Sequence, residues 1–355
     1  MEDGRSDQVF RPVLAKLAPG TVLRDAVQRI ILSARGALIV VGMDDSVAEV
    51  SSGGFAMEIN CTAQRLSELA KMDGAIILSN EGDRILRANV HLVPNSQIPT
   101  DETGMRHRSA ERVARQTKKP VISVSESMRI VTLYLDSGKT VLEDVSSLLF
   151  RANQALATLE RYRARLDEGS ASLSALEIED NVTVRDVVQV LRRAEMVVRI
   201  AEEIEGYIVE LGREGRLIEL QLDELMPHVQ EERALVVRDY LADRRRRLET
   251  VLNSLSELTS EEALDLDRIA KALAHDADQL DRPVAPRGYR LLSKIPRLPD
   301  PVIENLVKRF GSLQGVMGAS LEDLDDVEGV GEARARSIKD GLARLAESSL
   351  LERYV

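Results

Sequence analysis

The chain has 355 residues, 44% of them hydrophobic and 30% charged, which excludes a mainly disordered chain and is enough for two or three domains. Aromatic residues make up 3% with no Trp, and Cys61 is the single cysteine, so large base-stacking platforms and an intramolecular disulfide framework are excluded. The net charge of −11 belongs to the middle block, because residues 1–140, 141–285 and 286–355 carry +1, −12 and 0. The overall acidity therefore does not exclude nucleotide or DNA binding at either end.

The first block, residues 1–140, has the pattern of an α/β domain. Apolar residues at helical spacing alternate with short apolar runs typical of buried strands. Residues 80–83 have turn chemistry between two of these runs, which indicates a β-hairpin. The mixture predicts a mixed sheet flanked by helices. Helices are expected at 21–32 and 63–71, and strands at 37–42, 75–79, 84–93, 120–124 and 130–135.

The middle block, residues 141–285, predicts an all-α spacer domain. Apolar residues recur every three or four positions from Leu148 to Leu166, which is one face of a long helix. A second helix is expected to begin near Thr183, and further helical stretches near 231–258 and 261–273. The basic run Arg244–Arg247 fits a solvated helix face, with a phosphate-binding patch as the alternative.

The third block, residues 286–355, predicts an all-α domain with a helix-hairpin-helix pattern. Gly329, Val330 and Gly331 form an apolar residue flanked by glycines that opens a new helix. Such glycines let a hairpin backbone approach a DNA phosphate closely, with a helix N-terminus behind it. DNA binding is therefore expected here, against a protein-interaction role as the alternative. The cations that follow the hairpin are Arg334, Arg336 and Lys339, and residues 295–303 are expected to form a degenerate first copy.

The strongest local motif is the basic segment Gly104–Arg115. Ser109 is expected to cap a helix that begins at Ala110. Arg106 and Arg108 would then lie in an extended segment before this helix, with both side chains on the same side. Two guanidiniums beside a helix N-terminus suit a di- or triphosphate. Surface ion pairing is the alternative interpretation of these arginines.

A carboxylate stands at the start of a predicted strand in the sequence Asp73-Gly74-Ala75. The glycine permits close approach of a ligand to the backbone. A carboxylate in this position can bind a divalent metal or orient a hydroxyl group. A plain helix-to-strand turn is the alternative, because Asp and Gly are good turn residues.

The motifs Asp73–Ala75 and Arg106–Arg108 together resemble the diadenylate cyclase domain. With the helical spacer and the C-terminal helix-hairpin-helix, nearly the whole chain resembles the DNA integrity scanning family. The resemblance implies three domains: a cyclase domain at 1–140, a spacer at 141–285 and a DNA-binding domain at 286–355. Other segments that resemble the family are 84–94, 98–104, 120–125 and 151–161.

The resemblance implies that two ATP molecules become cyclic di-AMP and two pyrophosphates. Asp73 would serve the 3′-hydroxyl and bind the divalent metal, Mg²⁺ or Mn²⁺. The implied catalytic residues are Asp73, Arg106, His107 and Arg108. The implied nucleotide-binding residues are Gly74, Ala75, Leu92, Met105, Arg106, His107, Arg108, Ser109 and Ser125. Met105 departs from the family, which usually has Thr here, and a thioether cannot donate a hydrogen bond to phosphate.

The reaction itself constrains the assembly. Each ATP must present its 3′-hydroxyl in line with the α-phosphate of the other, so two pockets must face each other across a symmetric contact. The family resemblance implies a homo-octamer with facing cyclase domains. It also implies binding of branched DNA such as recombination intermediates, which lowers synthesis in DNA-damage signalling. The polar N-terminus and the lack of a long apolar run favour a cytoplasmic protein without a membrane span. The resemblance to a DNA-binding family implies that it is nucleoid-associated.

Two rival functions stay open on the sequence. One is a DNA-binding scaffold whose cyclase is weakened by Met105. The other is a DNA-repair nuclease that docks through the helix-hairpin-helix. Product analysis after incubation with ATP and a divalent metal separates both from the cyclase.

Overall fold

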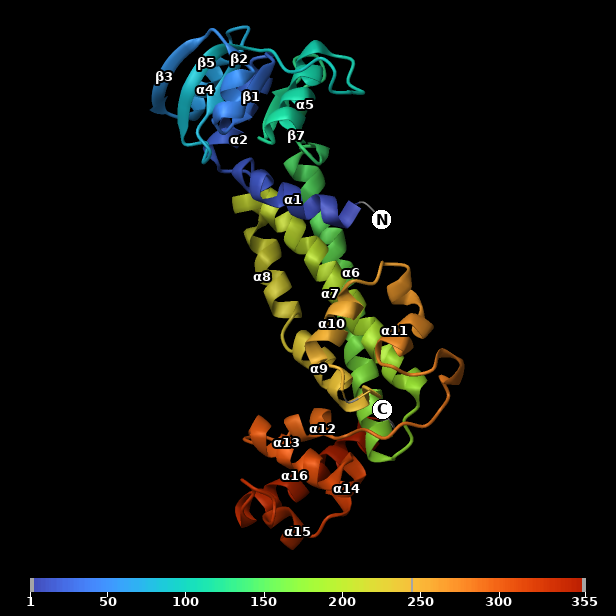
Figure 1. The fold of residues 1–355 in the computed structure, drawn as a ribbon. Helices are drawn as coiled ribbons and strands as arrows, with labels where there is room; N and C mark the ends of the chain where they lie inside the picture. Colours follow the sequence, from blue (N-terminus) through green and yellow to red (C-terminus); the bar gives the residue numbers. More distant parts are fainter. Residues whose placement is uncertain (1–2, 244, 353–355) are drawn as a thin grey trace. The chain divides into compact units, whose positions relative to one another are not determined.

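The computed structural model describes residues 3–243 and 245–352. The chain divides into two compact units (Figure 1). The first unit contains residues 1–154 and 203–220, and the second contains residues 155–202 and 221–355.

A mixed sheet forms the centre of the first unit. Its strands run in the order β2-β5-β4-β1-β6-β7-β8, and β3 pairs with β5. β1 and β4 are parallel, and every other pair named here is antiparallel. The strands are β1 (Ala37–Val41), β2 (Ser51–Ser52), β3 (Phe55–Asn60), β4 (Ala75–Leu78), β5 (Arg84–Leu92), β6 (Val121–Val124), β7 (Val131–Leu135) and β8 (Gly138–Val141). The predicted mixed sheet with flanking helices is confirmed.

Helices cover both faces of this sheet (Figure 1). Along β1, Ile39 and Val41 pack with residues of α1, α2 and α4, whereas Leu38 and Val40 pack with residues of α3 and α5. This alternation follows from the two-residue period of a strand, and the all-apolar sequence of β1 reflects burial on both faces. The helices are α1 (Asp3–Lys16), α2 (Val22–Leu32), α3 (Asp45–Glu49), α4 (Ala63–Leu69) and α5 (Met105–Thr117).

Three strands and two helices within residues 1–141 were not predicted from the sequence. β3 escapes a pattern search because Glu58 adopts a left-handed φ of 49° and the pairing with β5 shifts register between Ala56 and Ile59. The irregularity breaks the apolar alternation that identifies a strand. The other four unpredicted elements are β2, β8, α1 and α3.

The second unit is helical, which confirms the all-α prediction. Two long helices contribute residues to both units, α6 (Val145–Ile178) and α7 (Val184–Leu211). Asp186 accepts hydrogen bonds from the backbone and hydroxyl of Thr183, so the predicted start of α7 is confirmed. The 3₁₀ turns are η1 (Gly212–Gly215), η2 (Glu262–Leu264) and η3 (Ala277–Gln279). The remaining helices are α8 (Arg216–Leu225), α9 (Val229–Tyr240), α10 (Leu248–Ser256), α11 (Leu266–Ala272), α12 (Tyr289–Ser293), α13 (Asp300–Phe310), α14 (Leu313–Gly318), α15 (Leu321–Asp325) and α16 (Glu332–Glu352).

The helical stretch expected over 231–258 is two helices, α9 and α10, joined by a non-helical connection. Within this connection the carboxylate of Asp243 accepts a hydrogen bond from the backbone of Arg245, and Arg246 donates to the Ala272 carbonyl. The bond of Asp243 is local and competes with helix formation, whereas the bond of Arg246 is a contact with α11. The interpretation of the basic run as a helix face is therefore wrong for residues 245–247, and Arg244 lies outside the described residues.

A buried ionic cluster anchors α12 within the second unit. The Arg290 guanidinium donates to the carboxylates of Glu177 on α6 and Glu232 on α9. Asp239 accepts from the backbone N–H groups of residues 288–290 at the start of α12. Burial opposes the charge of Arg290, but the two carboxylates outweigh it and raise the pKa of Arg290 above its ordinary value. Removing one partner of such a cluster costs about 3–5 kcal/mol.

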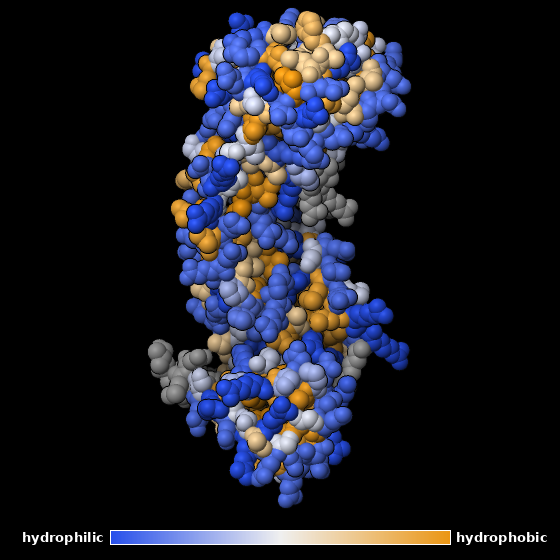
Figure 2. Space-filling model, turned by 90° about the vertical axis from the view of Figure 1, so that its left-hand side faces the viewer, coloured by the Kyte–Doolittle hydropathy of each residue, from blue (hydrophilic) through white to orange (hydrophobic). Residues whose placement is uncertain are grey.

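Polar residues cover most of the face seen in Figure 2, and hydrophobic residues reach that surface in separate patches. Exposed apolar side chains of the first unit include Phe150, Leu217 and Leu220. Among the described residues, no helix is long and apolar enough to span a membrane.

Candidate functional site

A cavity of about 430 Å³ lies in the first unit, where β1 and β4 begin and β5 ends. The start of α5 closes its side. Several residues predicted to bind nucleotide meet here although they are far apart in sequence. They are Asp73, Gly74, Ala75, Leu92, Met105, Arg106 and Ser109, together with residues 36–38, Met72, Val90 and His91.

Asp73 lies two residues before the start of β4, and its side chain is exposed at this first cavity. Gly74 follows it beside Asn89 of β5. A Cβ added at Gly74 would lie 2.5 Å from the backbone carbonyl carbon of Asn89, which is far inside van der Waals contact. The missing side chain at Gly74 therefore accommodates the neighbouring strand, in addition to any ligand in the cavity.

Helix α5 begins at Met105, with Gly104 as its N-cap, so the predicted start at Ala110 with Ser109 as cap is wrong. The backbone N–H of Arg108 already donates to the Gly104 carbonyl at 2.9 Å. Residues two apart in a helix are about 200° apart around its axis. The predicted same-side projection of Arg106 and Arg108 is therefore also wrong: Arg106 is half-buried at the first cavity, and Arg108 is exposed.

Arg106 packs against the backbone of Gly36, just before β1. A Cβ added at Gly36 would lie 1.8 Å from Nη1 of Arg106, so only glycine leaves room for this guanidinium. Sequence reasoning missed this role of Gly36. Its position directly before an apolar strand was the available signal, but nothing local connects it to a residue 70 positions later.

A second cavity, of about 560 Å³, also borders Arg106. It contains His107 and Ser125, both predicted site residues, and is completed by Ala34, Glu126 and Ser127. The hydroxyl of Ser125 accepts a hydrogen bond from the Met128 backbone in the turn between β6 and β7. Arg106 is thus the side chain shared by the two cavities.

A hydrogen-bonded chain of side chains orients His107. Its Nδ1 lies 2.8 Å from the Tyr134 hydroxyl, which donates to Glu102 at 2.9 Å, and Lys139 donates to the same carboxylate oxygen at 2.6 Å. The bond from Lys139 lowers the pKa of Glu102, while burial and Glu102 raise the pKa of Tyr134. Because the single hydroxyl proton of Tyr134 goes to Glu102, the hydroxyl accepts from Nδ1–H of His107. This leaves Nε2 of His107 for other partners.

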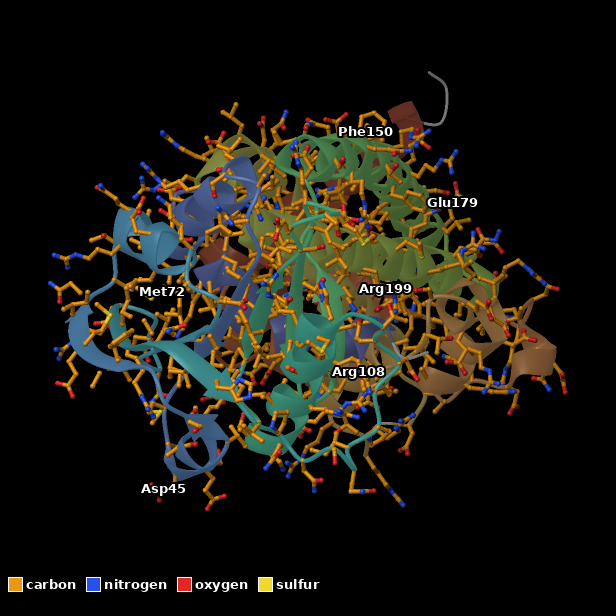
Figure 3. All side chains as sticks on the ribbon, turned by 90° about the horizontal axis from the view of Figure 1, so that it is seen from above. Asp45, Met72, Arg108, Phe150, Glu179 and Arg199 are labelled. Carbon is orange, nitrogen blue, oxygen red and sulfur yellow. The ribbon has the colours of Figure 1, made fainter. Side chains whose placement is uncertain are left out.

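Two predicted residues at the start of α5 are strongly exposed. Met105 is 85% exposed at the rim of the first cavity, so its side chain makes little packing contact. Arg108 is also exposed, and Figure 3 labels it together with Met72, the neighbour of Asp73. Side chains so exposed are available to a ligand or to another chain.

In the second unit, α15 and α16 form the predicted hairpin. The side chain of Val330 is buried, while Gly329 and Gly331 are exposed. Gly329 has a left-handed φ of 85°, which favours glycine. Asn305 of α13 donates to the Glu328 carbonyl at 3.0 Å and holds the hairpin against α13.

The cations after this hairpin differ in their surroundings. Arg334 donates to the Gly329 carbonyl, and Arg336 pairs with Glu332 one turn earlier in α16. Lys339 donates to the Met317 carbonyl at 2.8 Å, where it satisfies the C-terminal end of α14. Arg334 and Arg336 are exposed beside the hairpin, whereas Lys339 is half-buried in this structural contact.

Comparisons with family models match two consecutive stretches of the chain. Residues 24–139 match the family described as "DisA bacterial checkpoint controller nucleotide-binding", and residues 142–280 match "DisA bacterial checkpoint controller linker region". The chain is 58% identical to the DNA integrity scanning protein DisA of Acidothermus cellulolyticus, over 99% of this chain and 97% of that one. It is 57% identical to DisA of Kineococcus radiotolerans, over the full length of both chains. The chain therefore belongs to the DisA family of diadenylate cyclases.

Proposed function

We propose that the first unit condenses two ATP molecules into cyclic di-AMP, using the two cavities that meet at Arg106. The position of Arg106 is the observation that supports this proposal. Arg106 borders both the cavity that contains the Asp73 carboxylate and the cavity that contains the His107 imidazole. A triphosphate suits this arrangement, since a guanidinium binds phosphate oxygens in bidentate fashion.

The proposed chemistry assigns a role to each residue. Asp73 accepts the proton of the ribose 3′-hydroxyl, whose oxygen attacks the α-phosphorus of the second ATP. The new O3′–P bond forms as the bond to the β-phosphate oxygen breaks, and pyrophosphate leaves. Arg106, His107 and Ser109 hold the phosphates, with Ser125 nearby, while Gly74, Ala75, Leu92 and Met105 border the nucleotide. The family resemblance also assigns Arg108 to the phosphates, and this exposed side chain lines neither cavity.

A divalent cation fits the first cavity as a partner of the substrate. Among the described residues, no three His, Cys, Asp or Glu side chains cluster as a protein-only metal site. Mg²⁺ and Mn²⁺ suit an oxygen donor such as Asp73 together with substrate phosphates and water, because Mg²⁺ typically uses one or two carboxylates and keeps several waters. Such an ion would neutralise charge on the triphosphate and the leaving pyrophosphate.

We also propose a homo-oligomer, an octamer by family resemblance, in which cyclase regions face each other in pairs. The reaction has two equivalent steps, so two ATP molecules must lie head to tail across a symmetric contact. The strongly exposed Met105 and Arg108, at the start of α5, are placed to meet such a partner.

Product analysis tests the cyclase proposal. The full chain incubated with ATP and Mg²⁺ or Mn²⁺ should yield cyclic di-AMP, and Asp73→Asn should lower the rate by about 10²-fold or more because it removes the base and metal ligand. Asp45→Asn removes an exposed carboxylate outside both cavities and serves as the matched control. Near-normal turnover in Asp73→Asn would remove this residue from the mechanism.

For the C-terminal region we propose that the hairpin binds branched DNA, and that bound DNA lowers cyclic di-AMP synthesis at the nucleoid. The exposed glycines and the neighbouring arginines support backbone contacts without base readout, which predicts salt-sensitive binding. Junction and linear duplex are compared over a salt series, and synthesis is measured with and without junction. Binding with unchanged synthesis would leave a DNA-binding role and reject the coupling.

A further inference from the structure

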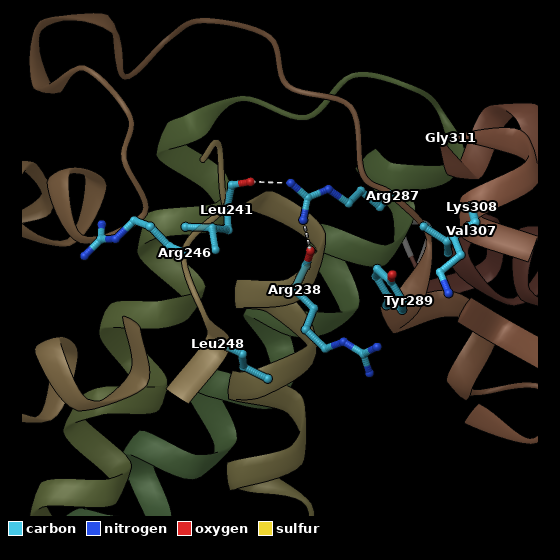
Figure 4. A pocket seen from close by; sticks show the side chains of 9 residues that line it. All are labelled: Arg238, Leu241, Arg246, Leu248, Arg287, Tyr289, Val307, Lys308 and Gly311. Atoms are coloured by element: carbon cyan, nitrogen blue, oxygen red, sulfur yellow. Dashed lines mark hydrogen bonds between the residues drawn. The ribbon is translucent and has the colours of Figure 1, made fainter. Parts of the chain in front are cut away.

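A groove of about 490 Å³ lies within the second unit, between the α9–α10 connection and helices α12 and α13 (Figure 4). Its apolar part consists of Leu241, Leu248 and Val307, beside the ring of Tyr289. The groove is separate from the hairpin and from both cavities of the first unit. Its remaining lining residues are Arg238, Arg246, Arg287, Lys308 and Gly311.

The charge of this groove is opposite to that of the sequence around it. Four of the nine lining residues are cationic and none is acidic. Four of the lining residues come from the block of residues 141–285, which has a net charge of −12: Arg238, Leu241, Arg246 and Leu248. A concentration of cations in an acidic region focuses a positive potential on one concave surface.

Several of these cations are held in fixed positions. Arg287 donates to the carbonyls of Arg238 and Leu241, and Arg246 donates to the Ala272 carbonyl. These bonds to backbone carbonyls hold the two guanidiniums in position. The Arg238 guanidinium stacks 4.1 Å from the centre of the Tyr289 ring and also pairs with Glu304. Groups that are already positioned lose less entropy when a ligand binds.

Lys308 differs from these arginines. It is exposed, and in the described part of the chain its ammonium has no hydrogen-bond or ion-pair partner. Figure 4 shows Lys308 and Arg238 on opposite sides of Tyr289. An exposed cation beside an aromatic ring and fixed guanidiniums is suited to a phosphate group.

Helix α13 connects the groove to the hairpin. Asn305 holds the hairpin through the Glu328 carbonyl, and a Cβ added at Gly329 would lie 3.2 Å from Val302. Lys308 follows Asn305 by three residues, a rise of about 4.5 Å along the helix. Because one helix contributes to both surfaces, the groove and the hairpin are held at a fixed spacing.

We propose that the groove binds the phosphodiester backbone of DNA whose neighbouring phosphates are held at the hairpin. This inference rests on the proposed DNA binding of the C-terminal region and extends it to a second contact surface. The contacts would be independent of base sequence, because the groove offers cations rather than a set of base-edge donors and acceptors.

The first test compares Lys308→Gln with Arg165→Gln in the full chain. Arg165 is an exposed cation of α6 outside the groove, so both variants lose one charge from the second unit. In Lys308→Gln, one phosphate contact is lost for each copy of the chain in contact with DNA. Each lost contact should reduce the steepness of the slope of log affinity against log salt concentration by about 0.9. The ratio of the DNA affinity of the unmodified protein to that of Lys308→Gln should then fall about 3.5-fold between 50 and 200 mM salt.

The second test measures proximity. A photocrosslinker is attached to Lys308→Cys or, as a control, to Arg165→Cys. The native Cys61 is buried, and burial with the nearby Asp83 raises the pKa of its thiol to about 11, so it reacts slowly at neutral pH. Crosslinks to bound duplex are expected from position 308 and not from position 165.

The outcomes separate the two proposals. If the unmodified chain binds no DNA, the proposed function of the C-terminal region fails. If it binds DNA normally but Lys308→Gln keeps the salt slope and position 308 gives no crosslink, the groove proposal alone fails. Binding of free ADP that depends on Lys308, with unchanged DNA affinity, would also overturn it.

Discussion

The first turn of α5 brings three adjacent side chains into three different surroundings. Arg106 packs over Gly36 between the two cavities, His107 is hydrogen-bonded to Tyr134, and Arg108 is exposed. The motif identifies the residue types that suit phosphate, but an extended segment and a helix distribute them differently. Because Gly104 rather than Ser109 caps the helix, adjacent positions point about 100° apart.

At the residue scale, Tyr134→Phe should reduce turnover by about 2- to 10-fold, because one hydrogen bond that orients His107 is lost at about 0.5–1.5 kcal/mol. The ring of Tyr134 is buried and its packing is kept, and Glu102 retains Lys139 as a partner. The tautomer of His107, measured by ¹⁵N NMR, should shift away from Nδ1–H. An unchanged tautomer would show that Tyr134 does not orient the imidazole.

Met105→Thr should increase ATP affinity or turnover. Met105 is 85% exposed, so the substitution loses little packing and introduces a hydroxyl at the cavity rim. One hydrogen bond to a charged phosphate is worth about 1.5–3 kcal/mol, which sets an upper limit of roughly 10- to 150-fold. Steady-state kinetics with ATP measure the effect, and unchanged or slower kinetics would mean that another group compensates for the missing hydroxyl.

At the scale of elements, the two hairpin glycines have different structural roles. Gly329 needs its left-handed backbone, whereas an added Cβ at Gly331 meets no atom within 4 Å. Gly331→Ser should therefore keep the melting temperature, since Ser is a good residue to precede helix α16, and should weaken DNA binding by obstructing phosphate approach.

Gly329→Ser serves as the contrasting variant. It places a side chain on a left-handed backbone and should lower the melting temperature, at a cost of about 1–3 kcal/mol. Equal DNA affinity in Gly331→Ser and the unmodified chain would indicate that DNA does not approach this backbone.

The boundaries of the helices and strands show which elements can be predicted from local sequence patterns alone. Strong periodicity predicted α2, β1 and α6 because apolar spacing is a property of consecutive residues. The break between α9 and α10 was missed because its cause includes the contact of Arg246 with α11, 26 residues away. The start of α5 was missed because glycine is a weaker capping signal than serine.

At the scale of the whole molecule, deleting the C-terminal region would also disrupt the buried ionic cluster around Arg290. Deleting residues 286–355 would take away Arg290 and leave Glu177 and Glu232 without their buried counter-charge. Loss of a buried partner costs about 3–5 kcal/mol, so the truncated chain should be less stable as well as unable to bind DNA. A hairpin variant such as Gly331→Ser separates the two effects.

A symmetric active site predicts how mixed oligomers behave. If each pair of facing chains must form two phosphodiester bonds, a pair with one Asp73→Asn chain closes no ring. Co-assembled with an equal amount of the unmodified chain, this variant should leave about one quarter of the activity, the fraction of pairs with two intact chains. Residual activity of one half would indicate that each chain works independently.

The sequence by itself determined the residue types of the site, the helical and strand periods, and the resemblance to a cyclase joined to a helix-hairpin-helix. These features are local, because turn chemistry and apolar spacing involve residues a few positions apart. Only the tertiary structure placed Gly36 beneath Arg106, linked His107 to Glu102 through Tyr134, and gathered the cations of the groove. Each of these contacts joins different elements, and a side chain has no way to specify its distant neighbour until the packing of those elements brings the two together.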